Sequence, residues 1–143
     1  MPRPRIYEPD QVLDAVESLA VAAGPGAVTI RAISAAIGAS NGALYHTFGS
    51  RAGLMGRAWL RAGRRFLTVQ NALVEQALSA TEPQAPLAAV AAAADAPVVF
   101  AERYPNSSKV LWAVSREELL DSDLPDGLAA ELRDLHRLLI GLM

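Results

Sequence analysis

The feature that most constrains the fold of this chain is a glycine-centred segment at residues 29–48, TIRAISAAIGASNGALYHTF. Its spacing predicts two short helices, capped by Thr29 and Ser40 and joined by a tight turn at Gly38. Ser34 is small enough to let the helices approach closely, and Leu44 is placed to anchor the second helix to the first. A helix-turn-helix requires this packing if its second helix is to enter the major groove of DNA. Two ordinary packed helices are the alternative that the spacing alone leaves open.

Apolar residues recur with helical spacing along the rest of the 143-residue chain, and strand signals are nearly absent. We therefore predict an all-α fold. Pro97 is expected to kink the helix that contains it, while Gly53, Gly56 and Gly63 either weaken their helix or allow close packing. The further helices are expected at about 9–23, 51–80, 86–103, 106–120 and 127–143.

Charge is divided unevenly along the chain. Residues 1–66 hold eight arginines against four acidic residues, whereas residues 67–143 hold five basic residues against eleven acidic ones. No acidic residue occurs between Ser18 and Val74. A basic head (residues 1–66) on an acidic body (residues 67–143) suits a protein whose head binds a polyanion. Chance segregation of surface charge gives the same pattern. The strong preference for arginine over lysine is typical of a GC-rich bacterial genome.

The residues expected to meet DNA lie on the helix after Gly38 and at the starts of the helices around it. Free backbone N–H groups at helix starts attract phosphate, and arginines beside them add positive charge. Hydroxyl, phenol and imidazole groups suit hydrogen bonds to phosphates or base edges, and small residues allow close approach. The candidate DNA-binding residues are Thr29, Arg31, Ser40, Asn41, Gly42, Ala43, Tyr45, His46, Ser50 and Arg51.

Residues 9–66 resemble the N-terminal domain of the TetR family of bacterial transcriptional regulators. The resemblance implies backbone contacts from the positions of Thr29, Ser40, Tyr45, His46 and Arg51, and base-edge contacts from 41–43. The chain departs from the family pattern at Ser34, where alanine is usual, at Ala43, where threonine is common, and at Ala52 and Gly53, which replace polar residues. The features that carry the resemblance are the first helix, the helix start at Thr29, the turn at Gly38, the run GALYHTF at 42–48, and Ser50-Arg51 followed by Leu54.

The resemblance also implies a domain organisation and a mechanism. Residues 6–66 would form the DNA-binding domain, and residues 67–143 a helical body for ligand binding and dimerisation. The chain would then be a repressor whose homodimer leaves its DNA operator when a small-molecule effector binds. Because family members usually carry further helices and the last helix is still amphipathic at residue 143, we expect the chain to be truncated there. If it is complete, either the last helix must serve the dimer or the protein binds DNA weakly as a monomer.

Aromatic residues in the body predict either an effector pocket or a shared hydrophobic core. The pocket candidates are Trp59, Phe100, Tyr104 and Trp112. The remaining alternative to a DNA-binding regulator is a helical ligand-binding or protein-interaction module whose head does not bind DNA.

Other functions have little support in the sequence. It contains no nucleophile motif, no phosphate-binding glycine loop and no metal-ligand spacing, so we expect neither an enzyme nor a bound metal or cofactor. We find no cysteine, no signal peptide and no apolar run near the roughly 18–20 residues that span a membrane. A cytoplasmic protein without a membrane partner is expected.

Overall fold

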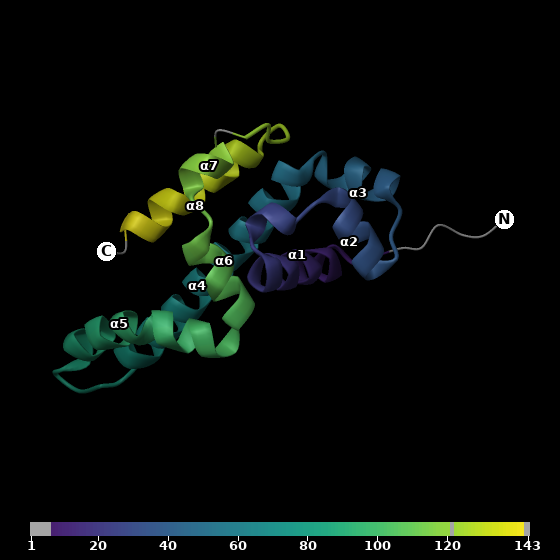
Figure 1. The fold of residues 1–143 in the computed structure, drawn as a ribbon. Coiled ribbons are helices and arrows are strands. Elements are labelled where there is room, and N and C mark those ends of the chain that lie inside the picture. The colour runs from purple at the N-terminus through teal and green to yellow at the C-terminus, as the bar shows by residue number, and fades with distance from the viewer. Residues whose placement is uncertain (1–6, 121, 142–143) are drawn as a thin grey trace.

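The computed structural model describes residues 7–120 and 122–141, and it is built from helices alone over this part of the chain (Figure 1). The all-α prediction is therefore confirmed for the described residues. The first five helices begin and end within about two residues of the predicted bounds, which is the usual precision of a helix boundary. The elements are α1 (Pro9–Ala23), the 3₁₀ turn η1 (Pro25–Ala27), α2 (Ile30–Ile37), α3 (Asn41–Phe48), α4 (Arg51–Leu78), α5 (Ala85–Arg103), α6 (Pro105–Ala113), α7 (Arg116–Leu120) and α8 (Leu128–Gly141).

The prediction of one helix at 106–120 is wrong, because α6 ends at Ala113 and α7 begins at Arg116. Val114 has an extended backbone, with φ −95° and ψ 119°. The hydroxyl of Ser115 then accepts a hydrogen bond from the backbone N–H of Glu118 at 3.5 Å, as a residue that starts a new helix does. The predicted continuation of the last helix through residues 142 and 143, and the first residue of the predicted domain at 6, lie outside the described residues.

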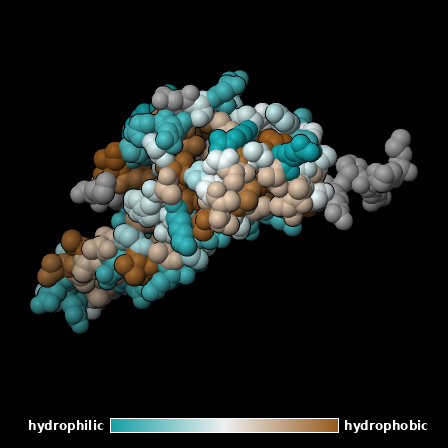
Figure 2. All heavy atoms as spheres, viewed as in Figure 1, coloured by the Kyte–Doolittle hydropathy of each residue, from teal (hydrophilic) through white to brown (hydrophobic). Residues whose placement is uncertain are grey.

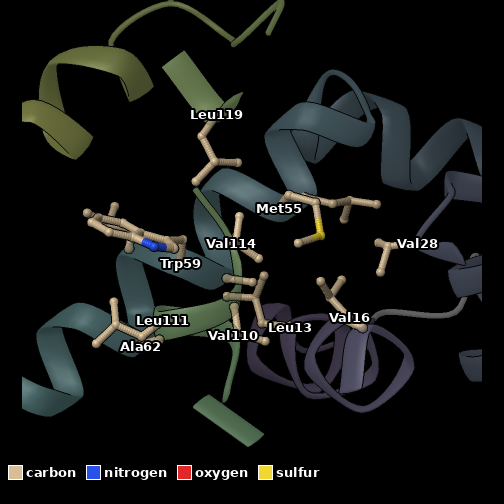
Figure 3. Close-up of a cluster of buried hydrophobic side chains, with 14 of the residues drawn as sticks. Leu13, Val16, Val28, Met55, Trp59, Ala62, Val110, Leu111, Val114 and Leu119 are labelled. Carbon is tan, nitrogen blue, oxygen red and sulfur yellow. The ribbon is translucent and has the colours of Figure 1, made fainter. Parts of the chain in front are cut away.

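Helix α4 connects the three-helix head, α1–α3, with the remaining helices (Figure 1). Its 28 residues extend for about 42 Å. Helices α1 and α3 contact it near its start, and α5, α6 and α8 pack along it. Buried side chains of the head and of the body form one continuous hydrophobic cluster, in which Val16 and Val28 lie beside Met55 and Val110 (Figure 3). The predicted domain boundary between residues 66 and 67 falls inside α4, and the division into two domains stays a prediction.

The glycines of α4 allow close packing, which was one of the two alternatives for them. A Cβ atom on Gly56 would lie 3.0 Å from Cδ2 of Leu128, and one on Gly63 would lie 2.5 Å from Cδ2 of Leu135. Both leucines belong to α8, so α8 rests directly on the glycine-bearing face of α4. The final amphipathic helix thus buries its leucine face against the helix that leaves the head.

Helix α5 is more apolar than the sequence analysis assumed. It is the one helix among the described residues that is long and apolar enough to cross a membrane, with a mean hydropathy of 1.4, because the apolar stretch continues through Pro97. Length and composition of a single helix are weak evidence for a membrane segment. In this structure α5 packs on α4 and α6, although only 22% of its apolar stretch is buried.

Gly53 provides a test of the corner between α3 and α4. A Cβ atom at this position would overlap the backbone carbonyl oxygen of Phe48. This oxygen cannot move without separating the end of α3 from the start of α4. We predict that Gly53→Ala lowers the free energy of unfolding by about 1–3 kcal/mol in urea denaturation. Gly42→Ala is the control, because a Cβ there meets no atom within 4 Å and alanine favours a helix. Equal stability of Gly53→Ala and the wild type would show that the corner is not closely packed.

Candidate nucleic-acid interface

The turn between α2 and α3 is built by Gly38 and Ser34. Gly38 has a left-handed backbone with φ 72°, which costs glycine least among the residues. The hydroxyl of Ser34 donates a hydrogen bond to the carbonyl oxygen of Ala39 across the turn. Ser34 therefore fixes the turn, which gives a physical role to this departure from the usual alanine. Leu44 is fully buried and anchors α3 as predicted.

Both helices of the pair begin with the predicted caps. The Thr29 hydroxyl accepts a hydrogen bond from the backbone N–H of Ala32 at 3.0 Å, and the Ser40 hydroxyl accepts one from Ala43 at 3.1 Å. Each cap satisfies one of the N–H groups that a helix start leaves free. The remaining N–H groups at each start keep their capacity for an anion.

The outer face of α3 presents the residues that the sequence predicts there. Tyr45 is 57% exposed, His46 is also exposed, and Ala43 is half-buried. A hollow of about 340 Å³ lies where the starts of α2, α3 and α4 meet. Six residues, none of them acidic, line it, and five of them are predicted DNA contacts. The lining residues are Thr29, Ile30, Arg31, Asn41, Tyr45 and Arg51.

Arg51 and Ser50 also support the fold. The Arg51 guanidinium donates hydrogen bonds from Nε to the carbonyl of Val28 and from Nη2 to that of Pro25, both at 2.6 Å. The Ser50 hydroxyl caps α4 and donates to the carbonyl oxygen of Asp123 at 3.1 Å. These two side chains therefore hold the loop before α2 and join the head to the loop before α8. Their contacts with phosphate stay a prediction.

Tyr7 contributes to the site although sequence reasoning missed it. Its hydroxyl donates a hydrogen bond to the carbonyl oxygen of Ala43 at 2.8 Å and lies 2.6 Å from Oγ1 of Thr47. Both partners are on α3, so Tyr7 fixes the orientation of the helix expected to read DNA. A lone aromatic residue before the first helix carries no signal for contacts 36 and 40 residues away.

Removing the Tyr7 hydroxyl tests this role. We predict that Tyr7→Phe lowers the free energy of unfolding by about 0.5–1.5 kcal/mol and speeds amide hydrogen exchange in α3. Tyr45→Phe is the matched control, because the Tyr45 side chain is exposed and should not affect either quantity. Unchanged exchange throughout α3 in Tyr7→Phe would show that the hydroxyl does not hold the helix.

A buried polar network joins the head to the body. Glu17 of α1 is only 3% exposed, and both of its carboxylate oxygens accept from the hydroxyl of Ser107 of α6, at 2.8 and 2.9 Å. Nη2 of Arg61 lies 2.9 Å from Glu17 and 2.9 Å from Asp14, and Nη1 of Arg65 donates to Ser107 at 3.0 Å. Burial, the largest single influence, lowers the pKa of Arg61, but Glu17 and Asp14 outweigh it and raise that pKa above its ordinary value.

Two of the four predicted pocket residues, Trp59 and Trp112, line one cavity of about 550 Å³ among α4, α5, α6, α7 and α8. The prediction does not hold for the other two. Phe100 is completely buried and packs edge-on against Phe66, with ring centroids 5.5 Å apart, so it belongs to the solid core. The ring of Tyr104 lies 4.7 Å from the Arg65 guanidinium and lines a different, arginine-rich cleft.

Comparison with known proteins agrees with this geometry. The sequence profile of bacterial regulatory proteins of the tetR family matches residues 12–58, which extend from α1 into α4. Residues 12–58 therefore form a TetR-type head. The motif resemblance is thereby confirmed for the head, and this head supports a DNA-binding transcriptional regulator. TetR family members are regulators rather than enzymes.

A solved structure with the same fold is that of the ketosteroid transcriptional regulator KstR2 of Mycobacterium tuberculosis. The two chains are 18% identical, with a TM-score of 0.64, and the alignment covers 97% of this chain and 66% of KstR2. This chain thus spans slightly less than two thirds of the length of KstR2. At this identity the likeness shows the fold alone. No curated protein matched the chain.

Proposed function

We propose that this chain is a bacterial, cytoplasmic repressor that binds a near-palindromic DNA operator as a homodimer and leaves it when a small-molecule effector binds. The observation that carries the DNA-binding half is the hollow at the three helix starts, which combines free N–H groups, Arg31 and Tyr45 without an acidic side chain. Phosphate contacts there would fix the head while α3 enters the major groove. Two heads would occupy successive major grooves about 34 Å apart.

The position of the cavity supports release by an effector. Trp59 and Phe66 of α4 line the cavity, and the same helix begins at Arg51, which holds the loop before α2. A ligand that fits one orientation of α4 better than another would shift the orientation of the heads, and this requires unequal affinity for the two states.

Exposed apolar side chains support the homodimer. Leu138 and Ile140 of α8 are 60% and 52% exposed, and Leu87, Val90 and Val98 leave an apolar stripe on α5. Figure 2 shows brown, hydrophobic surface over the end of α8 and over the arm formed by α4 and α5. Burial of such surface in a second chain is favourable in proportion to its apolar area.

Selection from a random duplex library, followed by gel shift on the enriched sequence, tests DNA binding. We expect sequence-selective binding that weakens steeply with salt. Arg31→Ala and Tyr45→Ala should each weaken it by about tenfold, the loss expected for one hydrogen bond to a charged phosphate. Arg133→Ala, which removes an exposed arginine from α8, is the control and should leave affinity unchanged.

The oligomeric state is measured on the same material by light scattering. A verified dimer that enriches no sequence would contradict the proposal and favour a helical ligand-binding or protein-interaction module whose head does not bind DNA.

A further inference from the structure

The cavity lined by the two tryptophans contains buried polar atoms without partners. Nε1 of Trp59, Oε1 of Gln70 and Nε of Arg116 have no hydrogen-bond partner among the described residues, and all three side chains line this cavity. Trp59 and Gln70 are 4% and 8% exposed. An unpaired buried polar group is unfavourable, and the large majority of buried side-chain polar atoms in proteins have a hydrogen-bond partner. Three on one cavity therefore point to an occupant with polar groups of its own.

The three atoms mark two ends of an elongated site. Trp59 and Gln70 are eleven residues apart on α4, which is about three turns and about 16 Å along one face of the helix. Phe66 lies between them on the same face. Arg116, on α7, lines the same cavity, and Val114, two residues before it, lines the cavity too and shares the buried cluster that contains Trp59.

The two ends differ in chemistry. The Trp59 indole and the Arg116 guanidinium are both N–H donors, and Arg116 carries a positive charge. Glu117 also lines the cavity; its carboxylate takes one Nη2 contact of Arg116 at 3.3 Å, and 72% of its side chain is exposed. His136 of α8 also lines the cavity. The unpaired N–H groups of Trp59 and Arg116 suit an acceptor, whereas the carbonyl oxygen of Gln70 suits a donor.

The walls between the ends are apolar. Val90 and Pro97 of α5 and Leu139 and Ile140 of α8 line the cavity together with Phe66. A ligand that reaches from Trp59 to Gln70 therefore passes over hydrocarbon and aromatic side chains, which favour a ligand with an apolar middle.

We propose that this cavity binds an elongated apolar carboxylate that carries a hydroxyl group at its far end, of the class of the ω-hydroxy fatty acids. The carboxylate accepts hydrogen bonds from Trp59 and Arg116, the chain fills the apolar middle, and the hydroxyl donates to Gln70. This ligand class rests on the proposed function, because it describes the effector site of the same regulator.

Tryptophan fluorescence of the full chain measures the binding without DNA, since both tryptophans of the protein line the cavity. The probes are 12-hydroxydodecanoate, whose extended length is close to the separation of Trp59 and Gln70, dodecanoate, and dodecan-1-ol. We expect 12-hydroxydodecanoate to bind about tenfold tighter than dodecanoate, and dodecanoate about tenfold tighter than dodecan-1-ol, because each loss leaves a buried polar group unpaired.

Variants assign the preference to individual side chains. Gln70→Leu should abolish the preference for the hydroxylated acid and still bind dodecanoate, and Arg116→Gln should abolish the preference for acid over alcohol. Gln76→Leu is the matched control, because Gln76 is an exposed glutamine on the same helix, and both preferences should persist. Failure of all three probes to bind would overturn the proposal. Binding whose preferences do not depend on Gln70 and Arg116 would also overturn it.

The test separates this proposal from the proposed function. Addition of 12-hydroxydodecanoate to the DNA complex measures operator release independently. If the acid binds with the expected preferences but does not release DNA, the ligand class stands and the effector-release mechanism is contradicted. If DNA binds selectively and no probe enters the cavity, the regulator stands and this ligand class is contradicted.

Discussion

The buried carboxylate of Glu17 is the interaction on which the placement of the head depends. Removing a charge from water costs several kcal/mol, so a carboxylate that is 3% exposed persists only where charge and hydrogen bonds compensate it. Arg61 of α4 and Ser107 of α6 supply that compensation. The Arg61 guanidinium is itself nearly buried, and its Nη2 lies 2.9 Å from the Glu17 carboxylate. Three helices are thereby fixed relative to one another at one point.

This point lies on the same two helices, α4 and α6, that line the cavity. Ser107 is on α6, one turn before Leu111, and Leu111 and Trp112 line the cavity. Arg61 is on α4, between the cavity-lining Trp59 and Phe66. A ligand that displaces α6 or α4 would therefore act on the same contacts that hold α1. Tyr7 adds contacts to the helix α3, because its hydroxyl bonds the carbonyl oxygen of Ala43 and lies 2.6 Å from Oγ1 of Thr47.

The sequence predicted the head well because its determinants are local. Caps at Thr29 and Ser40, the turn at Gly38 and the inward Leu44 all act within a few residues, where spacing translates directly into geometry. The contacts of Tyr7 with Ala43 and of Glu17 with Ser107 join residues 36 and 90 positions apart, and no local pattern encodes them. The four pocket candidates lie in different places for the same reason, since an aromatic residue such as Phe100 enters the core or lines a cavity according to how α4 and α5 pack. The break at Val114 was missed because the cap at Ser115 lies inside an otherwise helical pattern.

Residue-resolved amide hydrogen exchange of Ser107→Ala tests the central claim, that the buried network holds the head on the body. The change removes the hydroxyl that bonds both oxygens of Glu17 and should cost about 1–3 kcal/mol locally. Ser108→Ala is the control, since it removes a neighbouring buried hydroxyl that makes no bond to Glu17 in the described part of the chain. We predict that protection falls together in α6, in α1 around Glu17 and in α4 around Arg61. Loss of protection confined to α6 would contradict the claim.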